Sequence, residues 1–282
     1  MAARRRQPSE REQLSLFRAL PGDMRPRDAR DLMAYPFFSL AKQKRTAPID
    51  FAAGPVRIRV EAVPEHGMAT IWDADVLIWA ASQLVAARDR GLSTSRLIAA
   101  TPHEILTYTR RGTSQDDYRR LRAALDRLQS TTVATSLRQL DARRMHRFSW
   151  INEWKEIVQP DGRSAGLDLI LPDWFYSGVL SDALVLGIDP RYFTLTGGIE
   201  RWLYRLVRRH GGTQRMGWSF ELRHLYAKSG SRARYTDFAL DIRRLAQRQA
   251  LPGYCLRVAR VGGVEQLFFH RQPTRPSATL VP

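Results

Sequence analysis

The sequence contains little that would suit a disulfide-bonded, membrane-embedded or secreted protein. Its 282 residues include one cysteine, Cys255, which excludes a disulfide framework and any zinc site built on several thiolates. The longest apolar runs, such as residues 76–81, are far shorter than the ~20 residues that a membrane-spanning helix needs. The arginine-rich start is not followed by an apolar stretch, so it does not predict a secretory signal. We therefore expect a soluble cytoplasmic protein.

Motifs of common enzyme classes are also missing. No glycine-rich loop ends in Gly-Lys-Ser or Gly-Lys-Thr, which removes the usual ATP-binding loop. The 6 histidines form neither a His-Glu-x-x-His zinc motif nor a His-x-His metal motif. Asp73 and Asp75 resemble the acidic pair of a primase or nuclease, but they stand at the start of an expected helix, where Asp73 can cap free N–H groups. We expect no cofactor, no metal site and no enzymatic activity.

Negative charge is scarce in the last third of the chain. The net charge is +17, and only 4 of the 45 basic residues are lysine, so a GC-rich genome could have raised arginine everywhere. Residues 1–50 carry a net +5 and residues 51–190 a net charge of zero, whereas residues 191–282 have 17 Lys+Arg against 5 Asp+Glu, a net +12. Genome bias does not explain that loss of acidic residues. The segment predicts a polyanionic partner, most commonly nucleic acid. A membrane surface is the rival partner, but it requires a basic amphipathic helix or a lipid motif, and the sequence has no convincing example of either.

Hydrophobic periodicity indicates a folded first unit between polar ends. Residues 1–33 are polar and broken by prolines, so we expect a flexible basic arm, and residues 273–282 are expected to form a disordered tail. Within residues 34–188, a strand at 58–63 precedes three helices and then alternating segments typical of an antiparallel sheet. The helices are expected at 73–87, 102–109 and 114–128, and the strands at 132–137, at 148–151 and on both sides of a turn at 160–163. Winged-helix domains use this order.

Residues 189–272 repeat the order of helix, helix, turn, helix and hairpin. An amphipathic helix at 199–210 ends at two glycines, and a tight turn at 229–231 separates a short second helix from a third. Two alternating segments around Gly262-Gly263 then predict a β-hairpin. We therefore expect an α+β fold with two tandem winged-helix (helix-turn-helix plus β-hairpin) domains, at 34–188 and 189–272.

The third helix of a helix-turn-helix unit enters the major groove of DNA with its N-terminal residues nearest the bases. Arginine suits this position because its planar fork pairs with the two guanine acceptors or grips a phosphate. The DNA-binding candidates of the second unit lie on its third helix and hairpin: Arg232, Arg234, Tyr235, Arg243, Arg244, Arg248, Arg257 and Arg260. Those of the first unit are Arg110, Arg111, Ser114, Arg119 and Arg120. Because the first unit is neutral, we expect it to bind DNA more weakly or to serve as a partner surface.

Several stretches of the sequence are distinctive enough to indicate a family. The most specific are GMATIWDADVLIWAASQ at residues 67–83 and YPFFSLAK at residues 35–42. Others are Tyr118 with ALDRLQST at 124–131, YFTLTGG at 192–198 with ERWLY at 200–204, and LPGY at 251–254. Together they resemble the plasmid replication initiator protein A (RepA-type) family over roughly residues 34–270.

The resemblance implies a tandem winged-helix protein that binds repeated duplex sites (iterons) at a plasmid origin. It also implies melting of a neighbouring AT-rich segment, recruitment of the host initiator and replicative helicase, and a homodimer that represses its own promoter. The quoted motifs supply no catalytic residue and mark no DNA contact. Two alternatives stay open: a transcriptional repressor without a role in replication, and, from a different class, a primase or origin nuclease.

Overall fold

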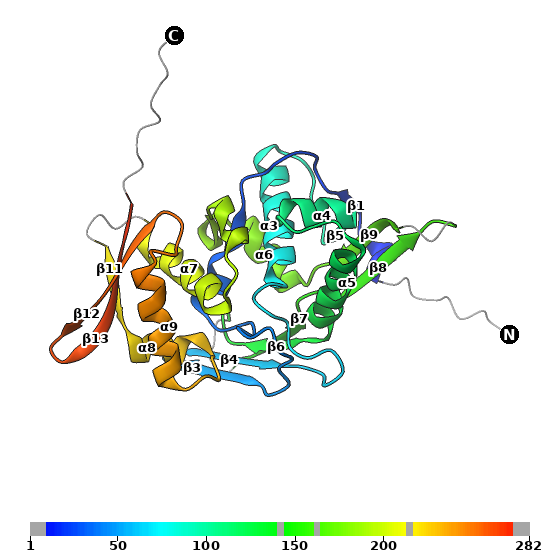
Figure 1. Ribbon diagram of the computed structural model, residues 1–282. Helices are drawn as coiled ribbons and strands as arrows, with labels where there is room; N and C mark the ends of the chain where they lie inside the picture. The colour runs from blue at the N-terminus through cyan, green and yellow to red at the C-terminus, as the bar shows by residue number, and fades with distance from the viewer. Residues whose placement is uncertain (1–9, 140–143, 161–163, 213–216, 273–282) are drawn as a thin grey trace, which may run out of the picture.

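A central helix organises the first half of the protein. The computed structural model describes residues 10–139, 144–160, 164–212 and 217–272. Helix α3 (Ala74–Asp89) agrees with the helix expected at 73–87, and it is buried on all sides because small and apolar residues occupy every face. It lies beside α4 (Pro102–Tyr108) and α6 (Asp173–Leu180) in Figure 1. Although α3 is apolar, no helix of the described ranges is long and apolar enough to cross a membrane.

One sheet of the first half ends in a projecting hairpin. Strands β5 (Leu97–Ala100), β9 (Ser164–Ile170) and β8 (Glu153–Val158) are antiparallel in this order, and β1 (Leu16–Arg18) pairs parallel with β5. The β8–β9 pair confirms the strands expected on both sides of the turn at 160–163. Strand β5 was not expected, because four apolar and small residues show no alternation.

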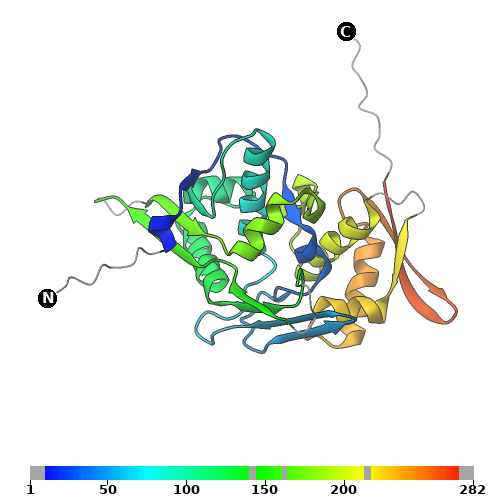
Figure 2. The ribbon, with the colours of Figure 1, turned by 180° about the vertical axis from the view of Figure 1, so that it is seen from behind.

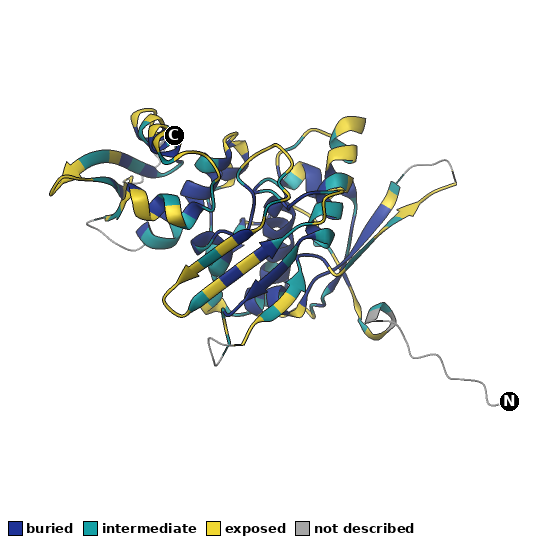
Figure 3. Ribbon diagram, turned by 90° about the horizontal axis from the view of Figure 1, so that it is seen from below, coloured by how far each residue is buried: buried dark blue, intermediate teal, exposed yellow. Residues whose placement is uncertain are grey.

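A second sheet forms an outer layer of the first half. Strands β3 (Ile49–Ala53), β4 (Val56–Glu61), β6 (Thr132–Thr135) and β7 (His146–Ser149) are antiparallel in this order. The sheet runs along the lower edge of the molecule in Figure 1, and seen from below it shows alternating stripes of buried and exposed residues (Figure 3). The alternation is expected of a sheet with one face on the core and one face in water.

The second half repeats the order of six elements of the first half, in which β6 and β7 additionally stand between the fourth and the fifth. It consists of α7 (Gly198–Gly211), β11 (Trp218–Glu221), α8 (Leu222–Ser229), α9 (Tyr235–Gln247), β12 (Tyr254–Val261) and β13 (Val264–Arg271). The corresponding elements of the first half are α3, β5, α4, α5 (Gln115–Ser130), β8 and β9. In both halves the third strand lies between the first and the second, in the orders β11-β13-β12 and β5-β9-β8. The two hairpins lie at opposite ends of the molecule (Figures 1 and 2), and the mixed α+β fold is confirmed.

Residues 10–33 pack against the rest of the protein and do not form the flexible arm expected for residues 1–33. Strand β1 joins the edge of one sheet, and β2 (Arg27–Ala29) pairs antiparallel with β10 (Val185–Gly187). Phe17 is buried. The apolar residues of this segment follow no regular period, and its strands are defined by partners far along the chain. Residues 1–9 and the tail expected at 273–282 lie outside the described residues.

The two halves share buried contacts. Arg201 and Arg205 of α7 are buried and pair with Asp75 and Asp28 from the first half. Met33 also packs into the hydrophobic core of the second half. The domain boundary expected near residue 188 stays a prediction. In the folded protein, residues of the first half also pack into the hydrophobic core of the second half. The remaining short elements are α1 (Glu10–Gln13), α2 (Arg30–Ala34), η1 (Asp182–Leu184) and η2 (Pro190–Thr194).

Candidate nucleic-acid interface

A tight turn joins α8 to α9, as expected for residues 229–231. Gly230 follows α8 with a φ of 61°, a left-handed conformation that glycine adopts without strain. The Ser229 hydroxyl donates to the Tyr226 carbonyl, and the Tyr226 hydroxyl donates to the Ala233 carbonyl, both at 2.7 Å. The turn is therefore held at both ends, and the angle between α8 and α9 is fixed by local contacts.

Helix α9 has an apolar face in the core, and exposed arginines stand near both of its ends. Phe238 and Ile242 are fully buried in the second core. Among the described residues, neither Arg232 nor Arg234 forms an ion pair, whereas Arg244 forms an ion pair with Asp241, three residues before it, at 4.0 Å. Four sequence-predicted candidates on this side are exposed: Arg232, Arg234, Arg244 and Arg248.

The hairpin after α9 carries two further exposed candidates. Val261 pairs with Val264 across Gly262-Gly263, whose φ values of 58° and 81° suit a tight two-residue turn, so the expected hairpin is confirmed. Arg257 and Arg260 are exposed on β12, and the Arg257 guanidinium lies 4.8 Å from the ring centre of Phe268. Stacking on the ring orients this cation without neutralising it.

Arg243 has a different role from the one expected. Its Nε and Nη2 donate to the two carboxylate oxygens of Glu265 on β13, at 3.0 and 2.7 Å. The hydrogen bonds from Arg243 lower the pKa of Glu265, which keeps the carboxylate charged. Arg243 therefore fixes the hairpin against α9, and its fork is occupied before any base could approach. The sequence could not show this, because the partner lies 22 residues away on another element.

Tyr235 packs beside an arginine that the sequence analysis missed. The tyrosine is half-buried, with its ring centre 5.7 Å from that of Tyr226. The Arg223 guanidinium lies 4.7 Å from the Tyr235 ring centre, and Arg223 is exposed on α8. It adds an exposed cation on the preceding helix, beside the start of α9. The sequence offered one signal for Arg223: it lies three residues before Tyr226, so the two side chains share the side of α8 that faces the start of α9.

The equivalent helix of the first half is balanced in charge. Ser114 caps α5: its hydroxyl accepts the Asp117 N–H at 3.3 Å, while the Asp117 carboxylate accepts the Ser114 N–H at 3.1 Å. One turn later, Arg119 pairs with Asp116 and Arg120 pairs with Asp117. Ser114 therefore has a structural role, and the two exposed arginines are partly neutralised by their own helix.

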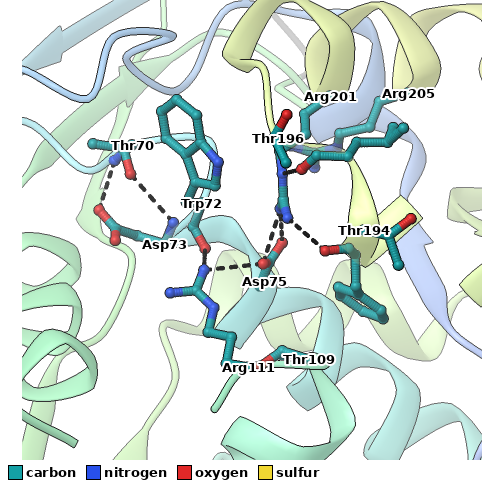
Figure 4. A network of polar contacts seen from close by, with 12 residues as sticks. Thr70, Trp72, Asp73, Asp75, Thr109, Arg111, Thr194, Thr196, Arg201 and Arg205 are labelled. Carbon is teal, nitrogen blue, oxygen red and sulfur yellow. Dashed lines mark hydrogen bonds and ion pairs between the residues drawn. The ribbon is translucent and has the colours of Figure 1, made fainter. Parts of the chain in front are cut away.

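Arg111 points into the protein, which corrects its place among the DNA-binding candidates. Its Nη2 donates to the Trp72 carbonyl at 2.6 Å and to the Asp75 carboxylate at 3.0 Å. Asp75 also accepts two hydrogen bonds from Arg201, at 2.8 and 2.9 Å (Figure 4). A buried carboxylate requires such cations, and Asp75 draws Arg111 inward. The neighbouring Arg110 is exposed.

Asp73 does not cap α3 through its side chain, contrary to expectation. Its carboxylate accepts the Thr70 N–H at 2.8 Å and two hydrogen bonds from Arg127, at 2.7 and 2.8 Å. No hydrogen bond links it to the N–H groups of the helix. Asp73 and Asp75 are thus both paired with arginines, and within the described ranges no group of three or more His, Cys, Asp or Glu residues could hold a metal ion.

The chain is similar to proteins of DNA replication. A family model described as Replication initiator protein A matches residues 27–256. A putative replication protein of Wigglesworthia glossinidia brevipalpis is 31% identical over 229 residues, which cover 80% of this chain and 82% of that relative. A crystal structure of domains 2 and 3 of RctB matches with a TM-score of 0.62 and 16% identity, over 86% of this chain and 98% of that one. A second RctB structure matches with a TM-score of 0.58 and 15% identity, over 86% and 97% of the two chains, and both support the fold.

Proposed function

Because the chain belongs to the Replication initiator protein A family, we propose that it starts plasmid replication by binding duplex DNA at the origin. The observation that carries the proposal is the cationic surface of the second half. This surface consists of Arg232, Arg234, Arg244, Arg248, Arg257 and Arg260, all exposed. Cations of this kind neutralise phosphates and release counterions, which drives binding to DNA.

We propose further that each half is a winged helix. In the second half, α8 and α9 are the helix-turn-helix, and the hairpin β12–β13 is the wing. Helix α9 then enters the major groove, with Arg234, the residue directly before its first turn, nearest the base edges. Arg257 and Arg260 contact phosphates beside the groove. The pair Arg243–Glu265 supports this arrangement, since it holds the wing and the helix in one orientation.

In this proposal the first half has a secondary role on DNA. The paired arginines of α5 favour weaker binding, and its neutral surface is suited to the host initiator, the replicative helicase or a second copy of the chain. Two units that each cover about one helical turn, ~10 base pairs, suit repeats of about 17–22 base pairs. The protein acts on these iterons by binding them and promoting the opening of AT-rich DNA, with no catalytic residue.

A salt titration of the full chain on a duplex carrying the repeats beside its gene tests the proposal. The logarithm of the affinity is expected to fall with the logarithm of salt by roughly 0.9 per phosphate contact. Arg234→Ala is expected to cost about 1–3 kcal/mol of binding and to relax specificity at one position. Arg90→Ala, which removes an exposed cation directly after α3 in the first half, is the matched control and is expected to bind normally. A flat salt response would overturn the proposal.

Replication and repression are separated by a maintenance assay. The gene and the repeats are placed on a circle with no other origin, and the circle is expected to be maintained in the host. Loss of the circle, with repression of the adjoining promoter intact, would favour a repressor. Incubation with Mg²⁺ and nucleotides or supercoiled origin DNA is expected to give neither primers nor nicks.

A further inference from the structure

A groove at the start of α9 has walls from both halves of the protein. Its volume is about 450 Å³. Residues 39–45, which follow α2 in the first half, form one wall, and residues 231–233 of the turn before α9 form the other. Figure 1 shows α8 and α9 beside β3 and β4, where the halves meet. A β-carbon on Gly230 would lie 3.0 Å from the β-carbon of Pro36, so the walls are in close contact behind the groove.

Cations from both halves line this groove. Lys44 and Arg45 come from the first half and Arg232 from the second, and no Asp or Glu is among the lining residues. Burial, and after it the charge of Arg232, lowers the pKa of Arg45. Like charges held together in a groove repel, and an anion between them removes the repulsion. The electrostatics therefore favour an anionic occupant.

Arg45 fixes one wall to the other. Its Nη1 donates to the Gly230 carbonyl at 2.6 Å, which ties the segment to the helix-turn-helix turn. Its Nε and Nη2 donate to the carbonyls of Ala47 and Pro48, both at 2.9 Å. Carbonyl oxygens orient a guanidinium without cancelling its charge, and these three bonds leave two of its five donors. Arg45 is thus a positioning residue that keeps its charge at the groove.

Lys44 is held in the same way. Its Nζ donates to the backbone carbonyls of Pro64 and Glu65, at 3.2 and 2.7 Å. One of the three ammonium donors is left, and among the described residues Lys44 forms no ion pair. An ordered side chain loses little conformational entropy when it binds, so such a cation is prepared for a ligand.

We propose that the groove holds a backbone phosphate of the DNA whose bases α9 contacts, with Lys44 and Arg232 as its ligands. This inference rests on the proposed function, because α9 must lie on DNA for the phosphate to reach the groove. Duplex DNA carries one phosphate charge per ~1.7 Å of axis, so a groove beside a reading helix meets a phosphate without bending the duplex. The first half thereby contributes to the site of the second half, and the phosphate fits only when the halves are arranged as observed.

Lys44→Gln and Arg232→Gln in the full chain test the inference. In Lys44→Gln, the glutamine amide keeps an N–H donor for the carbonyls of Pro64 and Glu65 but lacks the positive charge of the lysine. Each variant is expected to lower the slope of log affinity against log salt by roughly 0.9, because each removes one phosphate contact. The loss is expected to be similar on specific and unrelated duplexes, and melting temperatures without DNA are expected to match the unaltered chain. Arg90→Gln, at the exposed residue after α3, is the control and is expected to keep the full slope.

The outcomes distinguish this inference from the proposed function. If Lys44→Gln keeps the full slope while Arg234→Ala weakens binding, the groove takes no phosphate and the proposed function stands. Loss of slope in Arg232→Gln alone also overturns the inference, since the first half then contributes nothing. If the unaltered chain shows no salt-dependent binding to duplex DNA, the proposed function itself fails.

Discussion

Asp28 and Arg205 form an ion pair in the interior, and breaking it is expected to destabilise the protein strongly. Their side chains are 2% and 1% exposed, and the guanidinium donates to both carboxylate oxygens at 2.6 and 2.9 Å. Asp28→Ala removes both acceptors and leaves a buried cation without a counter-ion. Loss of one partner of a buried pair costs about 3–5 kcal/mol. Total stabilities are typically about 5–15 kcal/mol, so the loss is a large fraction of the whole.

Urea unfolding followed by circular dichroism measures this loss from the midpoint and slope. The matched control is Asp50→Ala, which breaks an exposed pair with Arg59 whose side chains are 61% and 46% exposed. Such a surface pair contributes only about 0–1 kcal/mol. The double variant Asp28→Leu/Arg205→Met is expected to recover most of the stability, because it removes both buried charges together. Equal losses in the Asp28 and Asp50 variants would refute the reasoning.

Two further predictions concern pH and helix capping. Burial lowers the pKa of His210 to about 4, so the stability that comes from keeping it neutral is complete above pH 6.5 and is lost as the pH falls toward 4. The drop in melting temperature between pH 7 and pH 5 is therefore expected to be smaller in His210→Gln than in the unaltered chain, and equal drops would contradict the assignment. Ser114→Ala removes the cap of α5 and is expected to cost about 1 kcal/mol in urea unfolding, whereas Thr113→Ala, at the exposed neighbour outside the capping box, serves as the control. Equal midpoints for these two variants would exclude the cap as the cause.

Hydrophobic periodicity predicted the amphipathic helices because each buries a regular stripe, whereas α3 is buried on every face. The helix expected at 199–210 corresponds to α7, and its apolar stripe packs in the second core. The same periodicity gave no sign that Arg201 and Arg205 are buried. Their partners lie 126 and 177 residues away, so no local window contains both members of either pair. Distant charge pairing is therefore, like strand β5 and the packing of residues 10–33, a part of this fold that the sequence could not predict.

The candidate site follows the same division. The exposure of Arg232 and Arg234 could be predicted, because they lie at the polar start of an amphipathic helix. The roles of Arg111 and Arg243 could not, since each depends on a carboxylate from another element. Whether an arginine of this protein is free to bind DNA depends on its distance to the nearest carboxylate in the folded structure. Sequence periodicity places the residue on a face but does not supply that distance.

Charge pairing also separates the two helices that occupy equivalent positions in the halves. The first turn of α5 contains Asp116 and Asp117, which pair with the arginines that follow them, so a phosphate approaching α5 must compete with these carboxylates. The first turn of α9 contains Asp237, and its neighbours Arg232 and Arg234 form no ion pair among the described residues. In the proposed complex, α9 therefore binds first. Once it is bound, the effective concentration of α5 at the adjacent groove is high, so even a weak contact there adds affinity whenever the spacing of the repeats lets both helices reach DNA.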